Sequence, residues 1–142
     1  MRILMIEDSR LIRAALGRML TKAGHIVVAV GDGQEGLQAA RDSKPDIILL
    51  DMMLPTLVGT SVLRMLKEDP ETNTIPVVIL SGLSQKNERK LLKDGAAAFL
   101  EKANIDLKGD GSHFVAALES LVTNLTREQP ALELAMTAKC GA

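Results

Sequence analysis

The chain has 142 residues, 46% of them hydrophobic, and a formal net charge of −1, which suits one domain with one core and argues against a nucleic-acid-binding surface. No apolar run approaches the length of a membrane span, and Met1-Arg2 leads directly into a strand-like run rather than a signal peptide. The single cysteine, Cys140, excludes an internal disulfide. We therefore expect a protein of the reducing cytoplasm that contacts neither DNA nor the membrane.

Apolar runs of strand length alternate along the chain with segments of helical period. We predict strands over residues 3–6, 25–30, 46–50, 77–80 and 97–101, and helices over 10–23, 34–42, 62–67, 87–94 and 113–125. Ser9 is placed to cap the first helix, and Gly24 to end it. The continuous apolar run before Asp51 is typical of a strand covered on both faces by crossover helices. This alternation predicts an α/β fold with a doubly wound, five-stranded parallel sheet.

The C-terminal part of the chain loses the helical pattern. The pattern weakens after Arg127, and Pro130 interrupts it. We therefore expect a domain over 1–125 and a tail or loose helix over 126–142. Such a tail is too short for a DNA-binding or enzymatic output domain, so we expect a single-domain protein.

Polar residues stand where the strand-like runs end. They are Glu7 and Asp8 after the first run, Asp51 after the third, Ser81 after the fourth and Lys102 after the fifth. In a parallel sheet these ends share one edge, where open α/β folds place their ligand sites. Asp51 follows a wholly apolar strand, where a carboxylate is costly unless it is paired. The set predicts a site that binds a divalent cation such as Mg²⁺ and receives a phosphoryl group.

Each of these residues, taken alone, also has a purely structural interpretation. Asp8 suits the positive N-terminus of the following helix, Ser81 suits a turn, and Lys102 suits a solvated surface. Their joint placement at one edge favours the functional interpretation.

The resemblance to a known family rests on these residues and their neighbours. They are Glu7-Asp8, Asp51 with Met52-Met53-Leu54-Pro55, Gly59, Ser81-Gly82, and Gly95 through Lys102. Over roughly residues 1–125 the chain resembles the receiver domains of two-component response regulators. The resemblance implies a flavodoxin-like fold with five parallel strands in the order 2-1-3-4-5.

The roles of the site residues follow from this resemblance. Asp51 is implied to be the phosphoryl acceptor, with Ser81 and Lys102 binding the transferred group. The ligands of Mg²⁺ or Mn²⁺ are implied to be Glu7, Asp8, Asp51 and the backbone carbonyl of Met53.

The resemblance also implies how the protein signals. A sensor histidine kinase or a histidine phosphotransfer protein donates the phosphoryl group. The protein is then a phosphoacceptor that assists its own phosphorylation and dephosphorylation, not an enzyme with a separate substrate. A switch through Ser81 and Phe99 presents the fourth helix, fifth strand and fifth helix to a downstream protein target. Self-association as a homodimer is left open. Met53 and Leu83 are implied to flank the path of the water that removes the phosphoryl group.

The segment after Lys102 departs from the family pattern. The family usually has a proline there, whereas this chain has Ala103-Asn104, and the loop to Gly111 is longer and more polar. The loop need not follow the family's conformation, but the chemistry of Asp51 is unaffected.

Two other functions are compatible with parts of the sequence. Gly31, Gly33 and Gly36 match G-x-G-x-x-G between a strand and a helix, which suggests a small dinucleotide-binding module. That alternative leaves the acidic residues and Lys102 without a role. The second alternative is a receiver-like module that binds proteins independently of phosphorylation. It ranks lower because every acidic and lysine position is present.

Overall fold

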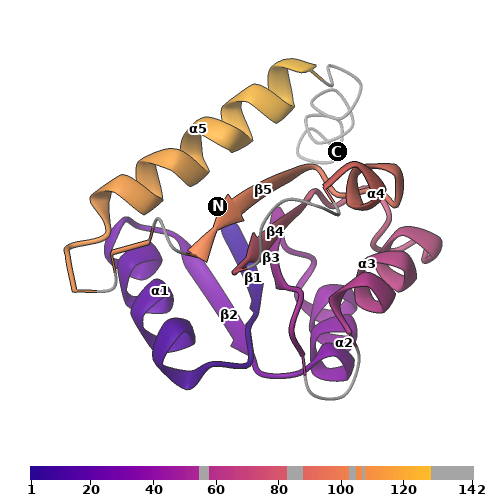
Figure 1. The fold of residues 1–142 in the computed structure, drawn as a ribbon, viewed down its shortest axis with the longest axis horizontal. Helices are drawn as coiled ribbons and strands as arrows, with labels where there is room; N and C mark the ends of the chain where they lie inside the picture. Colours follow the sequence, from indigo (N-terminus) through magenta and orange to yellow (C-terminus); the bar gives the residue numbers. More distant parts are fainter. Residues whose placement is uncertain (55–57, 83–87, 103–104, 107, 129–142) are drawn as a thin grey trace.

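The structure, a computed structural model, describes residues 1–54, 58–82, 88–102, 105–106 and 108–128. Pro55, Leu83, Asn87 and Ala103-Asn104, which carried sequence-based expectations, lie outside these residues. Five parallel strands form one sheet in the order β2-β1-β3-β4-β5, and helices cover both of its faces (Figure 1). The predicted fold class and strand order are confirmed.

Strands and helices alternate strictly along the described chain. The strands are β1 (Arg2–Ile6), β2 (Ile26–Val30), β3 (Ile47–Asp51), β4 (Val77–Ser81) and β5 (Ala98–Glu101). The helices are α1 (Arg10–Lys22), α2 (Gly33–Ser43), α3 (Gly59–Glu68), α4 (Glu88–Lys93) and α5 (Ser112–Glu128). In the described residues no helix is both long and apolar enough to cross a membrane.

The core has two halves, one on each face of the sheet. Along β1, Ile3 and Met5 pack with α1 and α5, whereas Leu4 and Ile6 pack with α2, α3 and α4. This division follows from the period of two in a strand, which sends successive side chains to opposite faces. Because both faces are covered, all five residues of β3 are buried, as the continuous apolar run predicted.

Local signals place the ends of the first two helices. The Ser9 side chain accepts a hydrogen bond from the N–H of Ile12 at 3.3 Å, as predicted. Gly24, just beyond α1, has a φ of 96°, a conformation that favours glycine. The Asp32 side chain caps α2 by accepting from the N–H of Glu35 at 2.8 Å.

Other boundaries differ from those predicted by periodicity. Helix α3 begins at Gly59, three residues before the predicted start at Val62, because its first turn packs against the end of β3. Helix α5 continues to Glu128, beyond the predicted end at Leu125. The expected division of the chain at residue 125 remains a prediction.

Candidate functional site

The strand ends that carry the predicted site lie along one edge of the sheet. In the pairing register, Ile6 is opposite Leu50, Asp51 is opposite Leu80, and Ser81 is opposite Glu101. The residues that end or follow β1, β3, β4 and β5 are therefore neighbours. This edge brings together side chains from opposite ends of the sequence.

Lys102 joins two buried carboxylates at this edge. Its Nζ lies 3.0 Å from Oδ1 of Asp51 and 3.0 Å from Oε2 of Glu7, and it also donates to Oε1 of Glu7 at 3.2 Å. Glu7 is only 1% exposed and Asp51 only 3%. One ammonium group thus neutralises part of the charge of two carboxylates that water hardly reaches, which offsets the cost of burying them.

Burial and ion pairing shift the pKa values of Glu7 and Lys102. Burial is the main cause that raises the pKa of Glu7, with the nearby charge of Asp51 adding to it and the hydrogen bond from Lys102 opposing it. For Lys102, burial acts to lower the pKa, but the hydrogen bonds to Asp51 and Glu7 outweigh it and the pKa is raised. Lys102 therefore stays protonated and cationic at neutral pH.

The backbone after β3 holds one oxygen of Asp51. The N–H of Met53 donates to Oδ1 of Asp51 at 3.2 Å, and Lys102 approaches the same oxygen. Both contacts are made to Oδ1. Among the described residues, no hydrogen bond or ion pair is made to Oδ2. Oδ2 is therefore the oxygen of Asp51 that is left free of these contacts.

The predicted metal ligands are only partly gathered. Glu7 and Asp51 lie together around Lys102, whereas Asp8 is exposed, and the described residues contain no ready group of three metal-binding side chains. The donor atoms nevertheless fit a hard cation. Oε2 of Glu7 is buried and, apart from its ion pair with Lys102 at 3.0 Å, accepts no hydrogen bond of good geometry from any described residue, and oxygen ligands are those that Mg²⁺ prefers.

The two predicted switch residues lie on neighbouring strands. Ser81 is the last residue of β4, beside Glu101 of β5; its side chain is outside the described part. Phe99 lies opposite Ile79 and packs, half-buried, against the core half formed by α2, α3 and α4.

The glycine motif serves packing in this structure. A Cβ built on Gly36 would lie 2.5 Å from Cδ1 of Ile6, so glycine permits the close approach of α2 to β1. The N-terminus of α2 is capped by the carboxylate of Asp32, where a dinucleotide would place its pyrophosphate. Both contacts favour the structural interpretation of Gly31, Gly33 and Gly36.

Two residues that shape the site were not recognised from the sequence in those roles. A Cβ built on Gly59 would lie 2.6 Å from Cα of Met52 and 2.7 Å from the carbonyl oxygen of Asp51, so only glycine lets α3 start so close to Asp51. Arg13 reaches back from α1 to the carbonyl oxygen of Glu7 at 2.8 Å. Its signal in the sequence is its place in the first turn of a helix that follows two acidic residues.

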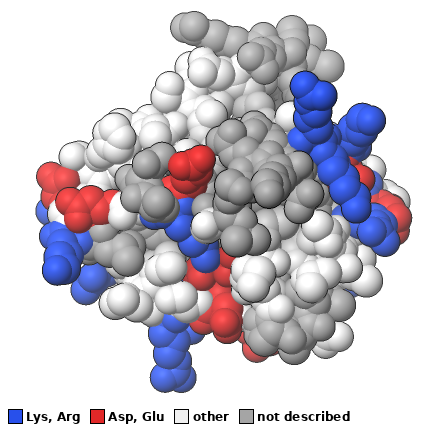
Figure 2. Space-filling view, in the orientation of Figure 1, with Lys and Arg blue, Asp and Glu red and all other residues white. Residues whose placement is uncertain are grey.

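The molecular surface also brings opposite charges together. Near the centre of the face drawn in Figure 2, acidic and basic surface lie side by side, between the half with α1 and the half with α2 and α3.

Comparison with known proteins identifies the family to which this chain belongs. Residues 3–108 match the family model described as "Response regulator receiver domain".

Two relatives illustrate how this match is distributed. Protein PilH of Pseudomonas aeruginosa is 38% identical over 102 residues, which cover 71% of this chain and 84% of PilH. A gliding motility regulatory protein of Myxococcus xanthus is 37% identical over 109 residues, which cover 76% of this chain. The matched part spans only 14% of the Myxococcus protein, so the same unit also occurs within a much longer chain.

Solved structures share the fold. The receiver domain of a sensor histidine kinase from Pseudomonas aeruginosa aligns with a TM-score of 0.73 and 24% identity, covering 86% of this chain and 97% of that domain. That structure has a magnesium ion coordinated in its active-site cleft.

Proposed function

Because this chain belongs to the family of response regulator receiver domains, we propose that it accepts a phosphoryl group on Asp51 and signals through contacts that depend on this phosphorylation. The observation that supports the proposal most directly is the ammonium group of Lys102, within 3.0 Å of both Asp51 and Glu7. Structural lysines at a surface rarely join two buried carboxylates. A cation beside the acceptor is what a phosphoryl group with its negative oxygens requires.

The positions of Asp51 and Lys102 support a direct transfer of the phosphoryl group to Asp51. The donor is a phosphohistidine on a sensor histidine kinase or a histidine phosphotransfer protein. Oδ2 of Asp51 attacks phosphorus in line, so a phosphorus–oxygen bond forms while the phosphorus–nitrogen bond breaks and the imidazole leaves. The N–H of Met53 holds Oδ1 and keeps the carboxylate oriented. Lys102 moves its interaction from the carboxylates toward the phosphoryl oxygens, with Ser81 as a second donor to them.

The residues that would hold the divalent cation are Glu7, Asp8, Asp51 and the backbone carbonyl of Met53. Mg²⁺ or Mn²⁺ bound there would neutralise charge on the phosphoryl oxygens during transfer. The buried Oε2 of Glu7 supports this assignment, since apart from its ion pair with Lys102 it accepts no hydrogen bond of good geometry from a described residue. The magnesium in the related receiver domain supports it independently.

Signalling then requires a protein that distinguishes the phosphorylated form. We assign the readout to the surface of α4, β5 and α5, with Ser81 and Phe99 as the switch, in a cytoplasmic protein. Phe99 supports this assignment because it lies on β5 and packs against the core half that includes α4. No DNA or membrane contact is part of the proposal, and self-association is left open.

Intact-mass spectrometry with acetyl phosphate as donor tests the assignment of Asp51. We expect one added phosphoryl group in the presence of Mg²⁺ and none with a chelator. The Asp51→Asn variant should not be labelled, whereas Asp42→Asn, an exposed position on α2, should be labelled like the wild type. Equal labelling of Asp51→Asn would refute the assignment.

The remaining alternatives give different results with the same protein. A dinucleotide-binding module would bind NAD(H) in a titration and ignore the phosphoryl donor. A module that binds proteins independently of phosphorylation would capture the same partners with and without acetyl phosphate.

A further inference from the structure

Arg13 bonds to the backbone of the loop that carries the two acidic residues. Its Nη1 donates to the carbonyl oxygen of Glu7 at 2.8 Å and to that of Asp8 at 3.4 Å. The N–H of Arg13 also donates to the carbonyl oxygen of Ser9 at 2.9 Å. Helix α1 and the loop before it are therefore joined at several points by a single residue.

Asp8 depends on this support more than Glu7 does. The Glu7 carboxylate is held directly, by the N–H of Ser9 at 3.1 Å and by Lys102. The Asp8 carboxylate is exposed, and no hydrogen bond or ion pair from another described residue is recorded to it. The direction of this carboxylate is thus set by the loop backbone, to which the guanidinium of Arg13 is bonded.

The absence of a side chain at Gly31 leaves room for the guanidinium of Arg13. A Cβ built on Gly31 would lie 2.9 Å from Nη1 of Arg13, and the three nearest atoms all belong to Arg13. Gly31 is not among the glycines with positive φ, so alanine is compatible with the backbone there. An alanine at this position would therefore act by displacing the end of the Arg13 side chain.

We propose that Arg13 is a positioning residue for divalent-cation binding, which holds the Glu7–Asp8 backbone so that both carboxylates face the cation. This inference rests on the proposed function, which assigns the cation to these residues. It adds to that function a residue that touches neither the cation nor the phosphoryl group. Groups that orient metal ligands in this way commonly have a measurable effect on metal affinity.

The positive charge of Arg13 and its hydrogen bonds to the loop have opposite expected effects on Mg²⁺ affinity, and the two effects can be separated by experiment. A positive charge near the acidic pair opposes the binding of a cation, so removing the charge alone would tighten Mg²⁺ binding. Losing the hydrogen bonds to the loop would weaken it. Gly31→Ala retains the charge and displaces the guanidinium, so it isolates the positioning effect.

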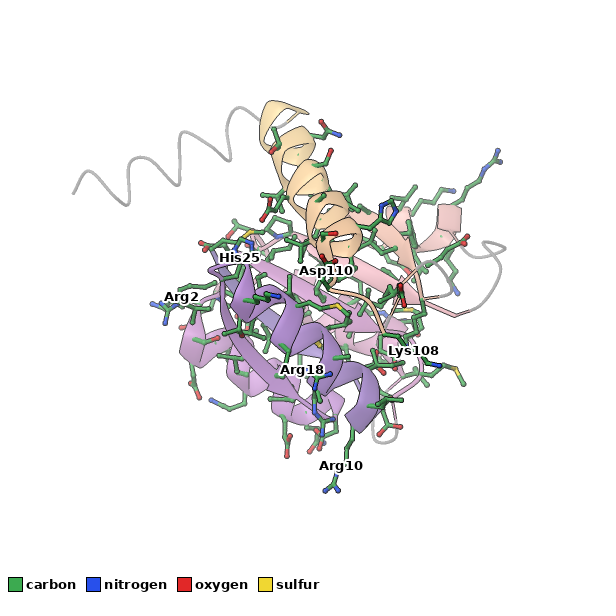
Figure 3. All side chains as sticks on the ribbon, turned by 90° about the vertical axis from the view of Figure 1, so that its left-hand side faces the viewer. Arg2, Arg10, Arg18, His25, Lys108 and Asp110 are labelled. Carbon is green, nitrogen blue, oxygen red and sulfur yellow. The ribbon has the colours of Figure 1, made fainter. Side chains whose placement is uncertain are left out.

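The experiment measures the dissociation constant of Mg²⁺ for the full, unphosphorylated chain by following amide NMR shifts. The variants are Arg13→Ala, Gly31→Ala and the double variant. The control is Arg18→Ala, which removes the same side chain from an exposed position of α1 (Figure 3). Urea unfolding of each variant confirms that it is folded at the temperature of the titration.

We expect the dissociation constant to rise about tenfold in Arg13→Ala and in Gly31→Ala, and to stay unchanged in Arg18→Ala. In the double variant the alanine at position 31 no longer meets a guanidinium, so the effect should equal that of Arg13→Ala alone. Unchanged or tighter binding in Arg13→Ala would overturn the inference. Independent, additive effects of the two substitutions would overturn it as well.

The result can be told apart from a failure of the proposed function. If Asp51 is not phosphorylated but the variants bind Mg²⁺ more weakly, the proposed function fails and the role of Arg13 stands. If Asp51 is phosphorylated and Mg²⁺ binding is insensitive to Arg13, only the inference fails. If the wild type binds no Mg²⁺, both fail.

Discussion

At the scale of single residues, the site is built around a deficit of positive charge. Lys102 faces two carboxylates that are both nearly inaccessible to water. One ammonium group cannot neutralise both, and apart from its ion pair with Lys102, Oε2 of Glu7 accepts no hydrogen bond of good geometry from any described residue. Such a cluster is costly in the resting protein. In the proposed function, a divalent cation or a phosphoryl group bound at this cluster would change the balance of charge.

We predict that Glu7→Gln stabilises the protein at pH 7 by about 1 kcal/mol when no divalent cation is present. The physical reason is the raised pKa of Glu7, which means that the folded protein binds this proton more tightly than the unfolded chain does. The contribution of Glu7 to folding is therefore largest at low pH and is lost as the pH rises through the raised pKa.

Urea unfolding at several pH values measures this effect. The advantage of Glu7→Gln should shrink as the pH falls toward 4.5, the ordinary pKa of glutamate, because Glu7 becomes protonated. Added Mg²⁺ should stabilise the wild type more than the variant. Glu68→Gln, at an exposed position of α3, is the control. A wild type that is more stable than Glu7→Gln at pH 7 without Mg²⁺ would contradict the prediction.

Met53 leads to a prediction about the lifetime of the phosphorylated form. The residue is 69% exposed, and its N–H donates to Oδ1 of Asp51. A thioether cannot orient an attacking water as an amide can. We expect Met53→Asn to accelerate loss of the phosphoryl group by up to about a hundredfold, measured as decay of the intact mass of the phosphorylated protein. Met53→Leu is the control, and equal rates in both variants would show that polarity at this position does not limit hydrolysis.

At the scale of elements, the start of α3 packs closely against the end of β3 at Asp51. The N–H of Gly59 donates to the carbonyl oxygen of Met52 at 3.1 Å, and the helix begins in van der Waals contact with the end of β3. By contrast, Gly17 in the middle of α1 has nothing within 4 Å of a built Cβ. Close packing thus requires a glycine at position 59 of α3, whereas no contact requires a glycine at position 17 of α1.

This contrast predicts opposite effects of the same substitution. Gly17→Ala should stabilise the protein by about 0.5–1 kcal/mol, the usual gain of alanine over glycine inside a helix. Gly59→Ala should destabilise it by about 1–3 kcal/mol, since the new methyl group would meet the backbone of Asp51 and Met52 as well as the end of the Met52 side chain, and the backbone atoms cannot simply turn away. Urea unfolding measures both. Gly59→Ala should also slow labelling of Asp51 by acetyl phosphate, whereas Gly17→Ala should not. If Gly59→Ala left the free energy of unfolding unchanged, α3 would be able to move away from β3 at little cost.

At the scale of the whole molecule, the site edge connects the two halves of the core. Phe99 of β5 lies opposite Ile79 of β4 and packs on the side of α2, α3 and α4. The next residue along β5, Leu100, packs on the side of α1 and α5. Figure 1 shows α4 and α5 on either side of β5. A change at the end of β4 can therefore reach both helices through one strand.

We predict that beryllofluoride, a mimic of the phosphoryl group, shifts the amide NMR signals of β5 and α4 as well as those of the site. A ligand at Asp51 that binds one packing of Phe99 better than another shifts the population between them. The Asp51→Asn variant is the control and should show none of these shifts. Changes confined to Glu7, Asp8, Asp51 and their immediate neighbours, with Phe99 and residues 88–101 unmoved, would reject the switch.

The sequence by itself determined the kinds of element and some of the residues at their ends. Ser9 caps a helix, and an apolar run before Asp51 forms a buried strand, because these features depend on hydrogen bonds and periodicity within a few residues. The same local order, together with the rule that parallel strands share one edge, predicted which polar residues would meet. The family resemblance added the strand order and the individual roles.

Only the tertiary structure decided how those residues meet. Lys102 and Glu7 are 95 positions apart, and whether one ammonium group joins two carboxylates depends on the register of four strands at once. The early start of α3 at Gly59 and the hydrogen bonds from Arg13 to the loop also depend on packing between elements. Periodicity describes which face of an element is apolar, but it carries no information on how closely two elements approach. Around Asp51, Glu7 and Lys102 that distance decides which side chains are in contact.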